Sequence, residues 1–99
     1  MLPIEVRITK DAGKFVPSQD PVTLSKSHGD VVQWQNDTGE QITIKFGAGT
    51  PFPGRMNPYT ISPGSFQQSG LIEGAAGKWK YNIEGASGAI TDPDVVIEP

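Results

Sequence analysis

Runs in which apolar and polar residues alternate one by one are the feature that most restricts how this chain can fold. Residues 4–9 and 78–83 alternate without interruption. A period of two is typical of a β-strand with one buried face. Further alternating or apolar runs occur at 22–26, 30–35, 42–46, 65–72 and 95–97. Spaced by roughly 8–12 residues and separated by turn residues, they predict an all-β sandwich or barrel of roughly seven or eight strands.

Glycine and proline mark the places where these strands should end. The chain holds 12 Gly and 9 Pro in 99 residues, which is high but below the level typical of disorder. We predict loops through 17–21 and 47–58, and a hairpin turn at 36–39, because Asn, Asp and Gly tolerate a positive φ. The last strand, 95–97, is interpreted as a candidate sheet edge that could pair with another chain.

Length and charge exclude several classes of function. The chain is predicted to be one domain covering residues 1–99. It has no cysteine, hence no disulfide, thiolate metal site or cysteine nucleophile. The net charge is −3 and no Lys/Arg cluster is present, so nucleic acid is not expected as a partner. No apolar run approaches the ~20 residues that span a membrane. The N-terminus lacks a signal-peptide pattern, so we expect a cytoplasmic chain or an exported form whose signal was removed.

Several landmarks occur along the chain in one fixed order. They are a Gly-Asp turn at 29–30, a Trp-Gln-Asn strand end at 34–36, an apolar strand reaching Phe46, a Pro-Gly turn at 63–64 and a Gly-Lys-Trp-Lys-Tyr strand at 77–81. In this order they resemble the cupredoxin family, from about Val22 to Ile97. The resemblance implies a Greek-key β-sandwich, which agrees with the fold predicted from the periodicity.

For function, the resemblance implies electron transfer through one copper ion held by a Cys thiolate, two His imidazoles and usually an axial Met. In the family the first His follows the Trp of the strand end by about eight residues, and that position holds Ile42 here. The family's Cys position, two residues past the second aromatic, holds Ile83. The following loop, 84–90, contains neither His nor Met. We therefore predict a cupredoxin-like domain with no copper site, no other metal and no cofactor.

A metal site built from unusual ligands is the alternative. His28 is the only histidine, and Met56 could serve beside it as a soft ligand. Nothing in their spacing supports such a pair, so we interpret His28 as a turn residue next to Gly29.

Two short motifs also have a candidate chemistry. Asp92-Pro93-Asp94 contains carboxylates, but a calcium loop needs more oxygen ligands at regular spacing, so we interpret it as a turn before the last strand. Asn36-Asp37-Thr38 fits the N-glycosylation pattern, in what we expect to be an exposed hairpin, and matters only in a secreted eukaryotic chain.

The loop at 47–58 contains the candidate binding residues. Aromatic and Arg side chains often anchor a protein partner, and Phe52, Arg55, Met56 and the adjacent Tyr59 form such a set. In the other interpretation, which we favour, Phe52 and Tyr59 fill the rim of the sandwich instead.

No catalytic motif is found: the sequence has no nucleophile elbow and no Gly-rich loop that opens a helix. Trp79 and Tyr81 alternate to one side, and we predict that both are core residues rather than a sugar platform. The leading hypothesis is a non-catalytic cupredoxin-like module with a binding or structural role, for which another protein is the expected partner. The alternatives are an electron-transfer protein with non-standard copper ligands and an unrelated immunoglobulin-like adhesion domain. Strand pairing separates the last alternative, because cupredoxins pair their first strand with their third.

Overall fold

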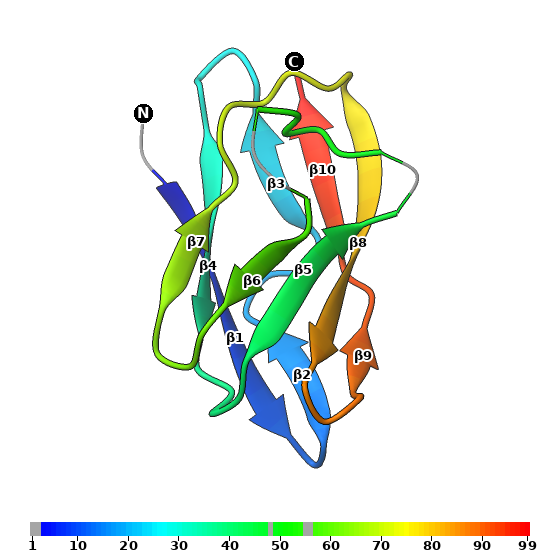
Figure 1. The fold of residues 1–99 in the computed structure, drawn as a ribbon. Coiled ribbons are helices and arrows are strands. Elements are labelled where there is room, and N and C mark those ends of the chain that lie inside the picture. Colours follow the sequence, from blue (N-terminus) through cyan, green and yellow to red (C-terminus); the bar gives the residue numbers. More distant parts are fainter. Residues whose placement is uncertain (1–2, 48, 55–56) are drawn as a thin grey trace.

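A computed structural model describes residues 3–47, 49–54 and 57–99, and these residues form ten strands in two sheets (Figure 1). The strands are β1 (Pro3–Asp11), β2 (Lys14–Pro17), β3 (Val22–Ser25), β4 (Val31–Asn36), β5 (Ile42–Phe46), β6 (Tyr59–Ile61), β7 (Phe66–Gln68), β8 (Gly77–Gly85), β9 (Ile90–Thr91) and β10 (Asp94–Glu98). The described part of the chain contains no helix that could cross a membrane. The all-β prediction is confirmed.

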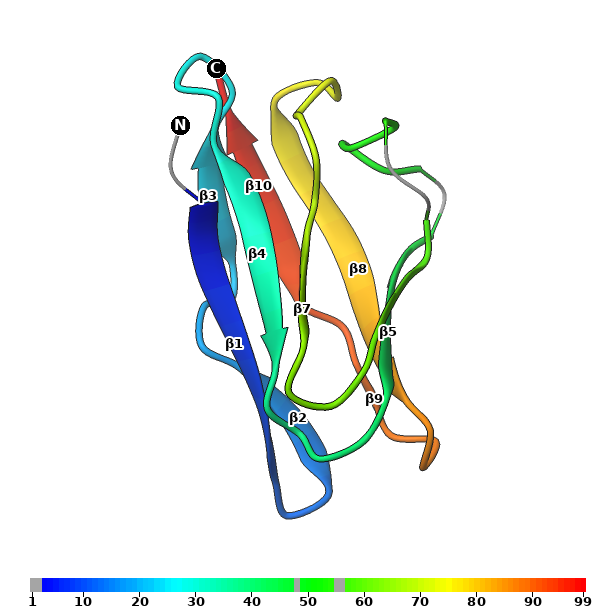
Figure 2. The same ribbon diagram turned by 60° about the vertical axis from the view of Figure 1, so that its left-hand side comes forward.

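The two sheets lie face to face, as the rotated view shows (Figure 2). One has the strand order β2-β1-β4-β7, and the other has the order β3-β10-β8-β5-β6, with β9 paired to β8. β1 and β4 run parallel, with Ile4 opposite Val32. These are the first and third of the strands predicted from the sequence, so the pairing is the one that the cupredoxin resemblance implies. The immunoglobulin-like alternative, with its two antiparallel sheets, does not account for it.

One predicted hairpin turn and one predicted sheet edge are wrong. The segment 36–39 was expected to close a hairpin, but β4 and β5 belong to different sheets, so this turn crosses the sandwich. The last strand is not an edge, because β10 lies between β3 and β8, with Val95 opposite both Val22 and Trp79. Turn residues show where a strand ends but do not show which sheet the chain enters next.

Three short strands were not predicted. The segment through Pro17 was expected to be a loop, yet β2 folds back on β1 through a turn at Ala12 and Gly13, whose φ values are 52° and 80°. Positive φ at both central residues is typical of the tight turns that join antiparallel strands. β2 buries only Phe15, β9 buries neither of its residues, and β6 buries Tyr59 and Ile61. In strands this short, too few residues alternate between apolar and polar for the pattern to be recognised in the sequence.

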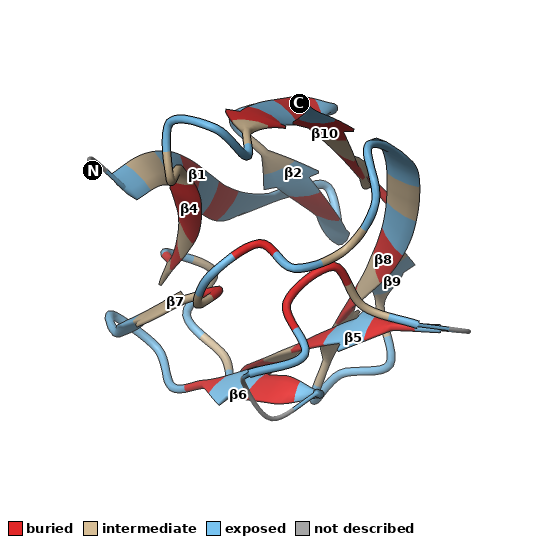
Figure 3. Cartoon of the chain, turned by 90° about the horizontal axis from the view of Figure 1, so that it is seen from above, coloured by how far each residue is buried: buried red, intermediate tan, exposed pale blue. Residues whose placement is uncertain are grey.

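The centre of the core is the ring of Trp34, which is fully buried. Four aromatic rings surround it with centroids 5.0–6.3 Å away, and they come from β5, β6, β8 and the loop after β5: Phe46, Phe52, Tyr59 and Tyr81. Burial also raises the pKa of the Tyr81 hydroxyl above its ordinary value, so this group is protonated at neutral pH. Buried segments from both sheets face one another across this core (Figure 3).

Trp79 differs from its prediction. Tyr81 and Ile83 are buried as expected, but Trp79 is only partly buried, near the start of β8. The reason is that β5 pairs with β8 only as far as Phe46 and Tyr81. Within the described residues, the pairing of β5 does not extend to Trp79, so alternation alone does not bury it.

Candidate functional site

Ile42 and Ile83 lie close together on the inner face of the β5–β8 pair. Ile42 is opposite Gly85 and Ile44 is opposite Ile83, which makes Ile42 and Ile83 diagonal neighbours across the two strands. Both side chains are fully buried. The two positions for which the resemblance implies a His and a Cys are therefore brought together in the structure, and both carry hydrocarbon side chains.

The space beside these isoleucines is filled by Phe15 and Glu40. A Cβ atom placed on Gly85 would lie only 2.3 Å from both Glu40 Oε1 and Phe15 Cζ, so the close approach of these two side chains requires glycine there. Phe15 is itself buried, with 3% of its surface exposed.

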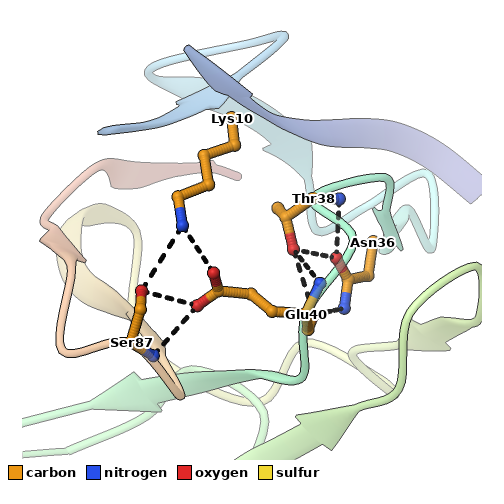
Figure 4. Close-up of polar contacts among 5 residues, drawn as sticks. All are labelled: Lys10, Asn36, Thr38, Glu40 and Ser87. Carbon is orange, nitrogen blue, oxygen red and sulfur yellow. Dashed lines mark hydrogen bonds and ion pairs between the residues drawn. The ribbon is translucent and has the colours of Figure 1, made fainter. Parts of the chain in front are cut away.

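A hydrogen-bonded cluster, here called the polar latch, covers this end of the sandwich and consists of Lys10, Glu40 and Ser87 (Figure 4). Lys10 Nζ lies 2.5 Å from Glu40 Oε2, and Glu40 Oε1 accepts hydrogen bonds from the Ser87 hydroxyl at 2.9 Å and backbone N–H at 3.2 Å. The latch joins three segments that are distant in the sequence: the end of β1, the β4–β5 turn and the β8–β9 turn. The bonds from Lys10 and Ser87 lower the pKa of Glu40 to about 2.

Asn36 supports the latch from inside. Its Nδ2 donates to the carbonyls of Glu40 at 2.7 Å and Ile61 at 2.9 Å, and its Oδ1 accepts from the N–H of Thr38 at 3.0 Å and its hydroxyl at 2.7 Å (Figure 4). Asn36 is fully buried. The expectation of an exposed glycosylation motif at 36–38 is therefore wrong: the side chain that would carry the sugar is used to hold the crossing between the sheets.

Of the other two candidate metal ligands, His28 and Met56, only His28 is described. His28 is exposed in the turn after β3, where Gly29 has a φ of 69°, at the end of the sandwich opposite the latch (Figure 1). Met56 lies outside the described residues. Over the described ranges no three His, Asp or Glu side chains are grouped so that they could hold a metal ion.

The Asp92-Pro93-Asp94 motif links β9 to β10, as the turn interpretation predicts. Its carboxylates face a lysine: Lys80 Nζ lies 3.8 Å from Asp92 Oδ2 and 3.4 Å from Asp94 Oδ1.

Of the four candidate binding residues, two are described and both lie in the core. Phe52 is fully buried, and Tyr59 is 5% exposed and donates its hydroxyl to the Ser69 carbonyl at 2.8 Å. Arg55 and Met56 lie outside the described residues. In this arrangement Phe52 fixes the middle of the loop to the sandwich and Tyr59 fixes the strand that follows it, so contact with a partner would have to come from other parts of the loop.

Sequence reasoning missed a groove on the β5–β8 side, here called the Trp79 groove. It has a volume of about 490 Å³, within the range of ligand pockets. It is lined by Lys45, Gly47, Gly49, Lys78, Trp79, Lys80, Tyr81 and Asn82. The available signal was the Lys-Trp-Lys run at 78–80, which we took only as strand alternation.

Comparison with known proteins establishes the fold. No protein-family model and no curated protein matches the chain. Among solved structures, a variant of amicyanin in its reduced Cu(I) form at pH 4 aligns with a TM-score of 0.64 and 17% identity over 95% of this chain and 82% of amicyanin. The chain has a cupredoxin-like fold.

Larger copper proteins contain the same fold. A multicopper oxidase aligns with this cupredoxin-like chain at a TM-score of 0.58 and 13% identity, over 98% of this chain and 42% of the oxidase. A variant of the multicopper oxidase McoA from the hyperthermophile Aquifex aeolicus aligns at 0.51 and 19% identity, over 97% and 27% of the two chains. At these identities the likeness concerns the fold alone.

The residues of this cupredoxin-like chain do not fit the copper ion that the fold implies. A thiolate ligand cannot form, because the sequence has no cysteine. Ile42 and Ile83 offer no donor atom, and Phe15 and the latch carboxylate of Glu40 fill the space next to them. The end of the sandwich that would hold copper is instead packed with hydrocarbon and closed by an ion pair.

The latch predicts a pH dependence of stability. The pKa of Glu40 is lowered from an ordinary value of 4.5, so its ionised form stabilises the fold above about pH 4.5 and this contribution is lost as the pH falls toward 2. We expect Glu40→Gln to lower the unfolding midpoint at pH 7 and the difference from the parent chain to shrink steadily below pH 4.5.

Circular dichroism melts at stepwise pH values measure this difference. Asp11→Asn, which changes an exposed carboxylate in the same β1–β2 hairpin, is the matched control and should leave the midpoint nearly unchanged. A Glu40→Gln deficit that stays constant down to pH 2 would show that the ionised carboxylate is not what the latch requires.

Proposed function

We propose that this chain is a non-catalytic binding module that uses the cupredoxin-like sandwich as a rigid scaffold for a protein partner, without copper. The observation that carries the proposal is that hydrocarbon side chains occupy the end of the sandwich at which the fold implies copper. Ile42 and Ile83 occupy two ligand positions side by side, while the strand pairing around them is that of the fold. A scaffold that keeps its topology and lacks the ligands of electron transfer fits a binding role.

The Trp79 groove supports a binding role over a catalytic one. Its lining offers lysines, an amide and aromatic rings. These groups recognise charge and apolar surface, but the described lining residues include no carboxylate or imidazole to act as a general base beside a nucleophile. The loop at 47–58 belongs to the same proposed surface, because Gly47 and Gly49 form one wall of the groove.

A copper titration tests the proposal against the electron-transfer alternative. The protein is mixed with Cu(II) and Cu(I), dialysed against a mild chelator and analysed for metal and for its visible spectrum. We expect substoichiometric copper and no thiolate charge-transfer band. Retention of one copper per chain would overturn the proposal, and loss of that copper in His28→Ala would assign the ligand.

A further inference from the structure

The Trp79 groove opens where a sheet stops being paired on one side. β10 pairs with β8 at residues 77–80, whereas β5 pairs with β8 only up to Tyr81. The N–H of Tyr81 donates to the Pro93 carbonyl on the β10 side at 3.0 Å. Because backbone groups alternate in direction along a strand, those of Lys78 point the other way, toward the groove. There the register provides Lys78 with no strand partner within the described residues.

The groove also has uncompensated positive charge. Lys80 is paired with Asp92 and Asp94, but Lys45 and Lys78 have no ion pair within the described ranges. Both side chains are exposed. The chain as a whole has a net charge of −3, so this local excess of positive charge is not a property of the general surface.

The ring of Trp79 forms a fixed apolar part of the lining. Its Nε1 donates to the Ala75 carbonyl at 3.0 Å, which holds the ring in place. Gly74 packs against the ring so closely that a Cβ there would lie 2.9 Å from Trp79 Cζ2 and 2.7 Å from the Pro51 backbone. The ring therefore needs little ordering when a ligand binds, which lowers the entropic cost of binding.

We propose that the Trp79 groove binds an acidic, extended peptide segment of a partner protein, which adds a short strand beside Lys78 of β8. This inference rests on the proposed function and names the chemistry of the partner. Hydrogen bonds to the open edge of β8 would align the peptide, its carboxylates would pair with Lys45 and Lys78, and an apolar residue would pack on Trp79. Peptide recognition by strand addition uses an unpaired sheet edge in this way.

An acidic polysaccharide is the competing ligand, since it too could use the lysines and the indole ring. The open backbone edge at Lys78 favours the peptide, because regular pairing with N–H and C=O groups at strand spacing is a property of another polypeptide backbone.

The test is a titration of the ¹⁵N-labelled protein with a short peptide of alternating Glu and Val, capped at both ends. We expect shifts of the Lys78 amide and the Trp79 indole N–H, and an affinity that falls as salt is raised. Charge reversal in Lys78→Glu or Lys45→Glu should weaken binding by about fivefold each, as expected for exposed ion pairs. Lys14→Glu, an exposed lysine of β2 with the same change of charge, should bind like the parent chain.

Two further ligands decide between the alternatives. The same peptide with an N-methyl group on every residue keeps its charges but has no backbone N–H on either edge, so it cannot pair as a strand and should not bind. Polygalacturonate carries carboxylates on a sugar chain and should bind less tightly than the peptide.

The inference is overturned if the Glu-Val peptide causes no shifts, if the N-methylated peptide binds equally well, or if only polygalacturonate binds. These results would leave the copper-free module intact, because that proposal depends on the separate metal titration. Stoichiometric copper with normal peptide binding would overturn the copper-free module and leave the peptide-binding groove intact.

Discussion

Trp34→Ala is expected to lower the free energy of unfolding by about 3–5 kcal/mol. Trp34 is fully buried, and four other aromatic rings pack around it from three strands and the loop after β5. Removing the indole would leave a cavity that these rings cannot fill without losing their contacts with one another. Because small domains unfold with only about 5–15 kcal/mol, the variant should lose much of its stability. Urea unfolding monitored by circular dichroism measures the change.

Trp79→Ala is the matched control, since it removes the chain's other tryptophan. Had Trp79 been a core residue, as its alternation predicts, the two losses would be similar. Its partial burial leads us to expect a cost of about 1–2 kcal/mol, within the ordinary range for single substitutions. Equal losses in the two variants would contradict the placement of Trp34 at the centre and Trp79 at the rim.

Asn36→Ala is expected to cost about 3 kcal/mol, although it removes no apolar surface of note. The amide satisfies the carbonyls of Glu40 and Ile61 and the N–H of Thr38, all near the crossing between the sheets. Without it, the Ile61 carbonyl loses this bond in a buried place, and Glu40 and Thr38 each lose one in a part-buried place. The cost of an unsatisfied buried group exceeds the gain from one hydrogen bond. The measurement is the urea midpoint at neutral pH.

Gln35→Ala provides the comparison for Asn36. Gln35 is the neighbouring amide in β4, and its hydrogen bonds to Asp37 and Gly64 are both 3.3 Å long and exposed. We expect it to cost less than about 1 kcal/mol, as for other surface changes. If Asn36→Ala cost no more than Gln35→Ala, the buried network would not be what holds the turn between β4 and β5.

The Asn36 prediction concerns an architectural question: how a cupredoxin-like sandwich closes the end at which the resemblance implies copper. Here Asn36 fastens the crossing between the sheets, and the latch of Lys10, Glu40 and Ser87 ties the end of β1 to the β4–β5 and β8–β9 turns above Phe15. A metal ion that joins several loops stabilises them by coordination. In this chain hydrocarbon packing and one ion pair occupy that place.

Much of the fold could be predicted because its signal is local. The alternation at 4–9, 30–35, 42–46 and 78–83 corresponds to β1, β4, β5 and β8, since neighbouring side chains of a strand must point to opposite faces. The order of landmarks along the chain also indicated the cupredoxin-like topology and the aliphatic residues Ile42 and Ile83. Both conclusions come from the resemblance to the cupredoxin family, which the types and spacing of these residues carry.

The misinterpretations share a physical cause, which is that pairing between distant segments leaves no mark in a local pattern. Asn36 and its neighbours have the composition of a hairpin turn, whether the next strand returns to the same sheet or crosses to the other. β10 looks like any terminal strand until β3 and β8 are placed on its two sides.

By itself, therefore, the sequence determined the strand class and the alternating core, because these follow from side-chain type at a period of two. The resemblance to the cupredoxins added that Ile42 and Ile83 stand at two positions for which it implies copper ligands. Only the tertiary structure decided the latch, the burial of Asn36 and the Trp79 groove. Each of these depends on which distant segments come together: the latch and Asn36 join segments of both sheets, and the groove lies where the pairing of β5 with β8 ends at Phe46 and Tyr81. Phe52 in the loop after β5 is likewise fully buried against Phe46, and no local pattern in the sequence encodes such packing.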